Sequence, residues 1–76
     1  MPDLIKEPPH YARWIIQPIE FITKNDFEFW RGNIVKYATR AGYKGDKAAE
    51  IADLHKVQQY AQIRINTLEG RGTLND

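Results

Sequence analysis

Two features of the sequence, its length of 76 residues and its lack of cysteine, limit most strongly what the chain can fold into. A chain of this size forms one domain, and folding removes only about 60% of its unfolded surface from water. Without cysteine, neither disulfides nor a thiolate metal site can add stability. Self-association is the remaining common way to enlarge the core. We therefore expect a single helical domain over residues 1–76 that forms a homo-oligomer.

Charge and hydropathy exclude several classes of protein. The 11 Lys and Arg residues nearly balance the 10 Asp and Glu residues, whereas a protein that binds duplex DNA in bulk usually carries a large positive excess. The chain has no run of about 18 apolar residues, and its first four residues lack the basic and apolar stretches of a signal peptide. We expect no specific binding of duplex DNA, no membrane partner and a location in a reducing cytoplasm.

The sequence predicts an all-α fold that begins with an extended arm and a short helix. Three prolines disfavour helix in residues 1–13, which we expect to be extended and to end near His10. Pro18 suits the first turn of a short helix that runs to about Lys24. Asp26 is a good N-cap residue for the next helix.

Two longer helices are predicted to follow and to form an antiparallel hairpin. In residues 27–41, apolar side chains recur at three- and four-residue spacing, and Gly42 is placed to end the helix. After a tight turn, Asp46 would cap a long helix over residues 47–69. Two glycines end this helix, and residues 70–76 are expected to form a frayed tail.

The long helix has apolar residues on two sides. Its main stripe, which only Gln58 interrupts, consists of Ile51, Leu54, Ala61, Ile65 and Leu68. Val57 and Ile63 lie off this stripe. A second apolar side in so small a domain indicates an interface between subunits.

Two polar stripes with the same spacing are predicted to face each other across the hairpin. The first consists of Asn33, Lys36 and Arg40, with Lys44 just beyond it, and the second consists of Asp53, Lys56 and Tyr60. Because the helices run antiparallel, the stripes could line one groove whose cations favour phosphates. A solvated helix face and a simple ion pair of Asp53 with Arg40 or Lys56 are the alternatives.

Three further features have both a structural and a functional interpretation. His10, with Tyr11 beside it, follows two prolines that could hold an imidazole over the groove, although a lone histidine is more often structural. Gly32 lies inside a predicted helix, where a glycine costs about 1 kcal/mol of stability relative to alanine. Either close packing of two helices or the approach of a ligand would explain a glycine at this position. Glu50 and Asp53 lie three residues apart and are the candidates to hold Mg²⁺.

Three strings of residues resemble a known family. They are Pro9-His10-Tyr11, then Gly32-Asn33-Ile34-x-Lys36-Tyr37-x-x-Arg40-Ala41-Gly42-x-Lys44, then Asp53-Leu54-x-Lys56-x-x-x-Tyr60. The chain resembles, over about residues 7–69, small tailed-phage proteins that are commonly labelled as nucleotide kinases or as a domain of unknown function. The resemblance implies a phage protein in the host-cell cytoplasm that phosphorylates dGMP and dTMP with ATP-type donors.

The resemblance also implies which residues act. By position these are His10, Tyr11, Asn33, Lys36, Arg40, Lys44, Asp53 and Lys56. In a kinase with ATP and Mg²⁺ as cofactors, Asp53 would hold the metal or orient the acceptor, and the lysines and Arg40 would bind phosphates. His10 would position a phosphate or donate a proton. The chain has no phosphate-binding loop of the Gly-x-x-x-x-Gly-Lys-Ser/Thr type. Because one subunit of 76 residues is too small to house two nucleotides, we expect a catalytic site to be shared across a subunit interface.

Two other functions remain open at this stage. A cationic oligomer could bind a nucleotide without turning it over and so sequester a host immune or metabolic signal. Alternatively, Trp14, Trp30 and the long helix could form a surface that binds and inhibits a host protein. Helical nucleoside-triphosphate pyrophosphatases are less favoured, because they need two carboxylate pairs and the chain offers one, Glu50 with Asp53.

Overall fold

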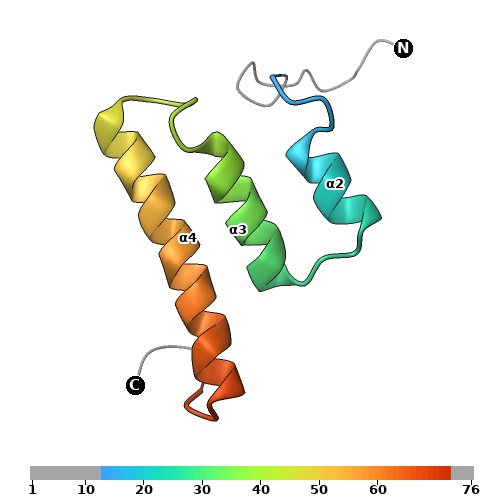
Figure 1. Cartoon of the computed structure of the whole chain (residues 1–76), viewed down its shortest axis with the longest axis vertical. Helices are drawn as coiled ribbons and strands as arrows, with labels where there is room; N and C mark the ends of the chain where they lie inside the picture. Colours follow the sequence, from blue (N-terminus) through green and yellow to red (C-terminus); the bar gives the residue numbers. More distant parts are fainter. Residues whose placement is uncertain (1–12, 73–76) are drawn as a thin grey trace.

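A computed structural model describes residues 13–72, and these fold into three α-helices with no strand among them. Helix α2 spans Pro18–Lys24, α3 spans Phe29–Arg40 and α4 spans Lys47–Leu68. α3 lies between the other two helices, and α3 and α4 run antiparallel (Figure 1). The prediction of an all-α fold built around a helical hairpin is confirmed. The predicted arm up to residue 12 and the end of the predicted tail, residues 73–76, lie outside the described part.

The connection from α2 to α3 differs from the prediction. Asp26 does not cap α3; it adopts a positive φ of 54° and closes the end of α2. Its N–H donates to the Thr23 carbonyl, and the next N–H, that of Phe27, donates to the Ile22 carbonyl. This pair of bonds satisfies carbonyls that the helix end would otherwise leave without partners. α3 consequently begins later than predicted, at Phe29, after an extended Glu28.

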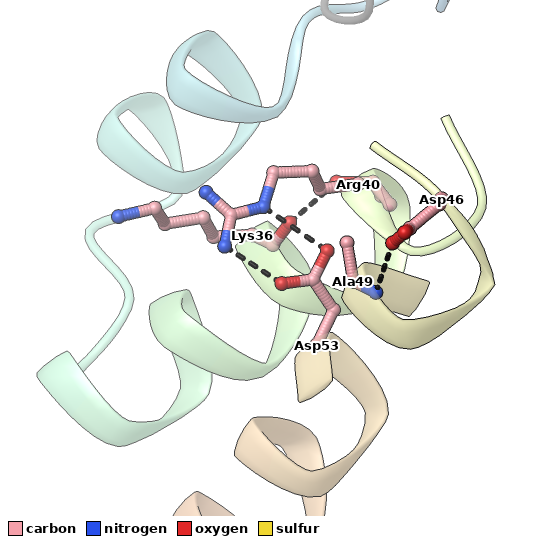
Figure 2. A network of polar contacts seen from close by, with 6 residues as sticks. Lys36, Arg40, Asp46, Ala49 and Asp53 are labelled. Atoms are coloured by element: carbon pink, nitrogen blue, oxygen red, sulfur yellow. Dashed lines mark hydrogen bonds and ion pairs between the residues drawn. The ribbon is translucent and has the colours of Figure 1, made fainter. Parts of the chain in front are cut away.

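The turn between α3 and α4 follows the prediction. α3 ends at Arg40, and Gly42 and Gly45 adopt φ values of 86° and 82°, which side chains with a Cβ rarely reach. Asp46 caps α4, because its side chain accepts a hydrogen bond of 3.0 Å from the Ala49 N–H (Figure 2). Glycines in this turn therefore supply the conformations that reverse the chain, and Asp46 sets the start of the long helix.

The packing of α2 against α3 depends on a glycine. Gly32 is buried in α3, and a Cβ added to it would lie only 2.9 Å from Cγ2 of Ile22 in α2. The structural interpretation of Gly32, close helix packing, is thus confirmed. Because glycine has no side chain, α2 can approach α3 closely at this position. α4 packs on a different side of α3 (Figure 1).

The described residues contain no buried large apolar side chain. Three helices in an open layer leave both faces of the layer uncovered, and the buried side chains of α4 are the polar Asp53 and Asn66. The main apolar stripe of α4 remains largely exposed, at 47% for Ile51, 47% for Leu54, 44% for Ile65 and 68% for Leu68. No helix of the described part is long and apolar enough to span a lipid bilayer.

Candidate functional site

The closest polar contact between the two long helices joins Arg40 of α3 to Asp53 of α4. Nη2 of Arg40 lies 2.7 Å from Oδ1 of Asp53, and Nε lies 3.2 Å from Oδ2 (Figure 2). The side chains retain only 19% and 8% of their exposure. This two-pronged geometry matches the planar fork of the guanidinium to the carboxylate. Of the interpretations that the sequence left open, the pair of Asp53 with Arg40 is the one that forms.

Aromatic rings extend this contact along the hairpin. Tyr37 and Tyr60 stack with ring centroids 6.2 Å apart and an angle of 13° between their planes, and the edge of Phe29 meets Tyr60 at 5.9 Å. The Arg40 guanidinium lies 4.8 Å from the centroid of Tyr37. Three members of the two polar stripes, Arg40, Asp53 and Tyr60, therefore lie in the interface between α3 and α4.

Lys36 and Asn33 share this face of α3 with Arg40 but take no part in the contact with Asp53. Lys36 extends away from Asp53 toward the side where α2 lies (Figure 2), and its Nζ is 5.1 Å from the centroid of the Tyr37 ring. Asn33 donates a hydrogen bond of 2.7 Å to the Phe29 carbonyl. Both residues line a cavity between α2 and α3.

This cavity has a volume of about 460 Å³ and a mainly apolar wall. Its lining consists of Pro18, Ile19, Ile22, Phe27, Glu28, Phe29, Gly32, Asn33 and Lys36. A volume in this range accommodates a small organic ligand. Sequence reasoning identified Asn33, Lys36 and Gly32 but missed Glu28 and the apolar wall, because most of that wall comes from α2 and the linker that follows it.

Glu28 and Lys36 give the cavity one group of each charge. Nε of Arg31 lies 2.8 Å from Oε1 of Glu28, and this hydrogen bond holds the pKa of the Glu28 carboxyl below its usual range. The carboxylate is therefore ionised at neutral pH. Lys36 forms no ion pair within the described part of the chain, so its charge is available to a ligand.

The other predicted site residues do not gather around this cavity. Lys44 is exposed in the turn and Lys56 is exposed on α4. Glu50 is half-buried, and its carboxylate lies under the turn, 3.3 Å from where a Cβ on Gly42 would stand. His10 and Tyr11 lie outside the described residues.

The predicted Mg²⁺ ligands, Glu50 and Asp53, do not form a ready metal site. Within residues 13–72, no three His, Cys, Asp or Glu side chains come together in a way that could hold a metal ion. Both oxygens of Asp53 accept hydrogen bonds from Arg40. Asp53 could offer an oxygen to a cation only by releasing part of that contact, and the residues present do not fit the ion well.

The two tryptophans proposed for a protein-binding surface are both packed against other side chains. The rings of Trp14 and Tyr43 form a T-shaped pair with centroids 5.5 Å apart. The Trp30 ring lies 4.5 Å from the Arg31 guanidinium and 5.4 Å from that of Arg64. Both side chains are half-buried, so neither presents a fully exposed ring to a partner.

Comparison with known proteins places the chain in one family. Residues 5–62 match the model of a family described as a protein of unknown function, DUF3310. No curated protein and no solved structure matches the chain. The match covers more than half of the sequence and includes the hairpin up to the second half of α4. The chain therefore belongs to the DUF3310 family.

Proposed function

We propose that this protein binds a nucleotide in the cavity between α2 and α3, with the phosphate beside Lys36. The observation that carries the proposal is the combination of a mainly apolar cavity of about 460 Å³ with the Lys36 ammonium in its wall, which forms no ion pair within residues 13–72. Binding sites for small molecules commonly join an apolar wall to a few polar groups that fix the orientation of the ligand. A nucleotide has the matching parts, because its base is a flat ring and its phosphate is an anion.

The charges of the cavity favour one orientation of such a ligand. The Lys36 ammonium attracts the phosphate as a point charge, whereas the Glu28 carboxylate, already paired with Arg31, offers the phosphate no attraction. Glu28 can accept hydrogen bonds from the N–H groups of a base. The rings of Phe27 and Phe29 offer apolar surface between these two charges. The base therefore points toward Glu28 and the phosphate toward Lys36.

Two versions of this function differ in what happens after binding. Phosphoryl transfer to a deoxynucleoside monophosphate is the activity that the resemblance implies, and it requires cations to neutralise the developing charge on the phosphate. Arg40 is the other cation of the predicted phosphate-binding face on α3, but Asp53 already engages its guanidinium through two hydrogen bonds. Binding without turnover needs no change in this contact. Sequestration of a nucleotide is therefore the second candidate function, and the observation in its favour is the intact Arg40–Asp53 pair.

A calorimetric titration with deoxynucleoside monophosphates, ATP and cyclic dinucleotides tests the proposal. Replacing Lys36 by alanine is expected to weaken binding about 10- to 100-fold, since a hydrogen bond to a charged group contributes about 1.5–3 kcal/mol. Lys47→Ala is the matched control, because Lys47 is an exposed lysine at the start of α4 and does not line the cavity. Equal affinities for the wild type and Lys36→Ala would remove the cavity from the proposal.

Incubation of the bound nucleotide with ATP and Mg²⁺ separates the two versions. A kinase converts the monophosphate to a diphosphate, and its Asp53→Asn variant loses that conversion. A sequestering protein returns the nucleotide unchanged, and its Asp53→Asn variant keeps its affinity. Circular dichroism of the variant shows whether α3 and α4 remain folded, which keeps a loss of turnover distinct from a loss of structure.

A further inference from the structure

The geometry points to a second copy of the chain as the partner of α4, joined to it as a parallel two-stranded coiled coil. The contact surface, here called the α4 seam, consists of Ile51, Leu54, Gln58, Ala61, Ile65 and Leu68. Their spacing alternates between three and four residues throughout, which is the a and d spacing of a heptad repeat. This inference does not rest on nucleotide binding, since none of these residues lines the cavity between α2 and α3.

The α4 seam lies on a part of the helix that the hairpin does not use. α4 meets α3 through Asp53 and Tyr60, which contact Arg40 and Tyr37. At about 100° per residue, the centre of the seam lies roughly 110° around the helix from Asp53. Accordingly, the four large seam residues keep 44% to 68% of their exposure. α3 supports one side of α4 and leaves the seam available to another helix.

The residue types within the α4 seam favour two parallel strands. The alternation assigns Ile51 and Ile65 to a positions and Leu54 and Leu68 to d positions. A β-branched residue at a, together with leucine at d, favours a parallel dimer over larger assemblies. Gln58 then occupies the central a position, where it would meet Gln58 of the second copy. A polar pair at one a position fixes the register of such a dimer.

The charges beside the α4 seam are compatible with a parallel pair of helices. In a parallel pair, each g position faces the e position five residues later in the other chain. Glu50 would then face His55 of the second copy, and Arg64 would face Glu69. The remaining pair, Val57 with Gln62, is uncharged. No like charges meet in this register, and Arg64 is complementary to Glu69 on each side of the dimer, where Glu69 also pairs with Arg71 of its own chain.

The seam spans about two and a half heptads, which is short for a free coiled coil. α4 does not depend on the seam alone for its helical structure, because Asp46 caps it and α3 packs along it. The described part of each copy buries no large apolar side chain of its own. A second copy would cover the seam residues that the layer leaves exposed, and this explains why apolar residues occupy that side of α4.

A single-cysteine experiment tests the orientation directly, because the natural chain contains no cysteine. Gln58→Cys is expected to form a disulfide-linked dimer under mild oxidation. In a parallel pair the two Cα atoms at this position come within the roughly 4.4–6.8 Å that a disulfide spans. Gln59→Cys is the matched control: it is an exposed glutamine on the same helix but outside the seam, and it should remain uncrosslinked.

The same experiment can overturn the inference. If Gln58→Cys crosslinks no better than Gln59→Cys, while a mixture of Gln58→Cys and Ala61→Cys does crosslink, the helices pair antiparallel. If light scattering of the wild-type chain gives the mass of one copy, 8.9 kDa, no second copy covers the seam. A mass of two copies together with selective crosslinking at residue 58 supports the parallel coiled coil.

Discussion

Arg40 shows how far single residues could be assigned from the sequence. Its spacing from Lys36 predicted a phosphate-binding face, and an ion pair with Asp53 was one of the alternatives. The spacing fixes which residues share a helix face, but the contact across the hairpin also depends on how the two helices are rotated against each other. In the structure this rotation directs Arg40 and Asp53 toward each other and Lys36 toward α2. The arginine is thereby assigned a structural contact and the lysine a place in the cavity.

Replacing Arg40 by alanine should therefore lower the free energy of unfolding, because Arg40 pairs with Asp53 and does not line the cavity. The change leaves the buried Asp53 carboxylate without its partner, and breaking a buried pair in this way costs about 3–5 kcal/mol. Urea denaturation should show this loss as a lower midpoint. The double variant Arg40→Ala/Asp53→Ala should recover part of it, because no uncompensated charge remains. Additive losses from the two single changes would mean that the side chains do not interact in solution.

At the scale of the helices, the sequence predicted correctly which helices form, but it predicted their first residues less accurately. Helical spacing located all three helices, and glycines and Asp46 located the turn of the hairpin. The start of α3 was misplaced because aspartate suits two different positions, the N-cap of a helix and the left-handed residue after a helix end. Asp26 takes the second position, with a φ of 54°. Only the hydrogen bonds back to α2 distinguish the two, and they have no linear signature.

Two aspartates with these different positions should respond in opposite ways to mutation. Asp26→Gly is expected to stabilise the protein by about 0.5–1 kcal/mol, because glycine adopts positive φ without steric cost. Asp46→Ala should destabilise it by about 1 kcal/mol through loss of the cap on α4. Urea denaturation of both variants against the wild type provides the comparison. A loss of stability in Asp26→Gly would indicate that Asp26 caps α3 after all.

At the scale of the whole molecule, the cavity was the feature least accessible from the sequence. Asn33 and Lys36 were recognised as polar members of a helix face, but the cavity that they line also needs Pro18, Ile19 and Ile22 of α2. The position of α2 against α3 depends on the contact of Ile22 with the bare backbone of Gly32. The sequence marked Gly32 as an unusual residue inside a helix, but it did not indicate that Ile22 of α2 would pack against it. The resemblance in sequence could therefore point to candidate site residues without locating the cavity.

The most direct test of the account is to locate the bound nucleotide by two-dimensional NMR. Chemical shifts of the ¹⁵N-labelled protein would be followed during titration with dGMP or whichever nucleotide binds in calorimetry. Binding in the cavity predicts the largest changes at the backbone amides of Ile19, Ile22, Gly32 and Asn33, and smaller changes at Lys56, which is exposed on α4. Changes that gather on α4 and leave the amides of the cavity unmoved would contradict the proposed site.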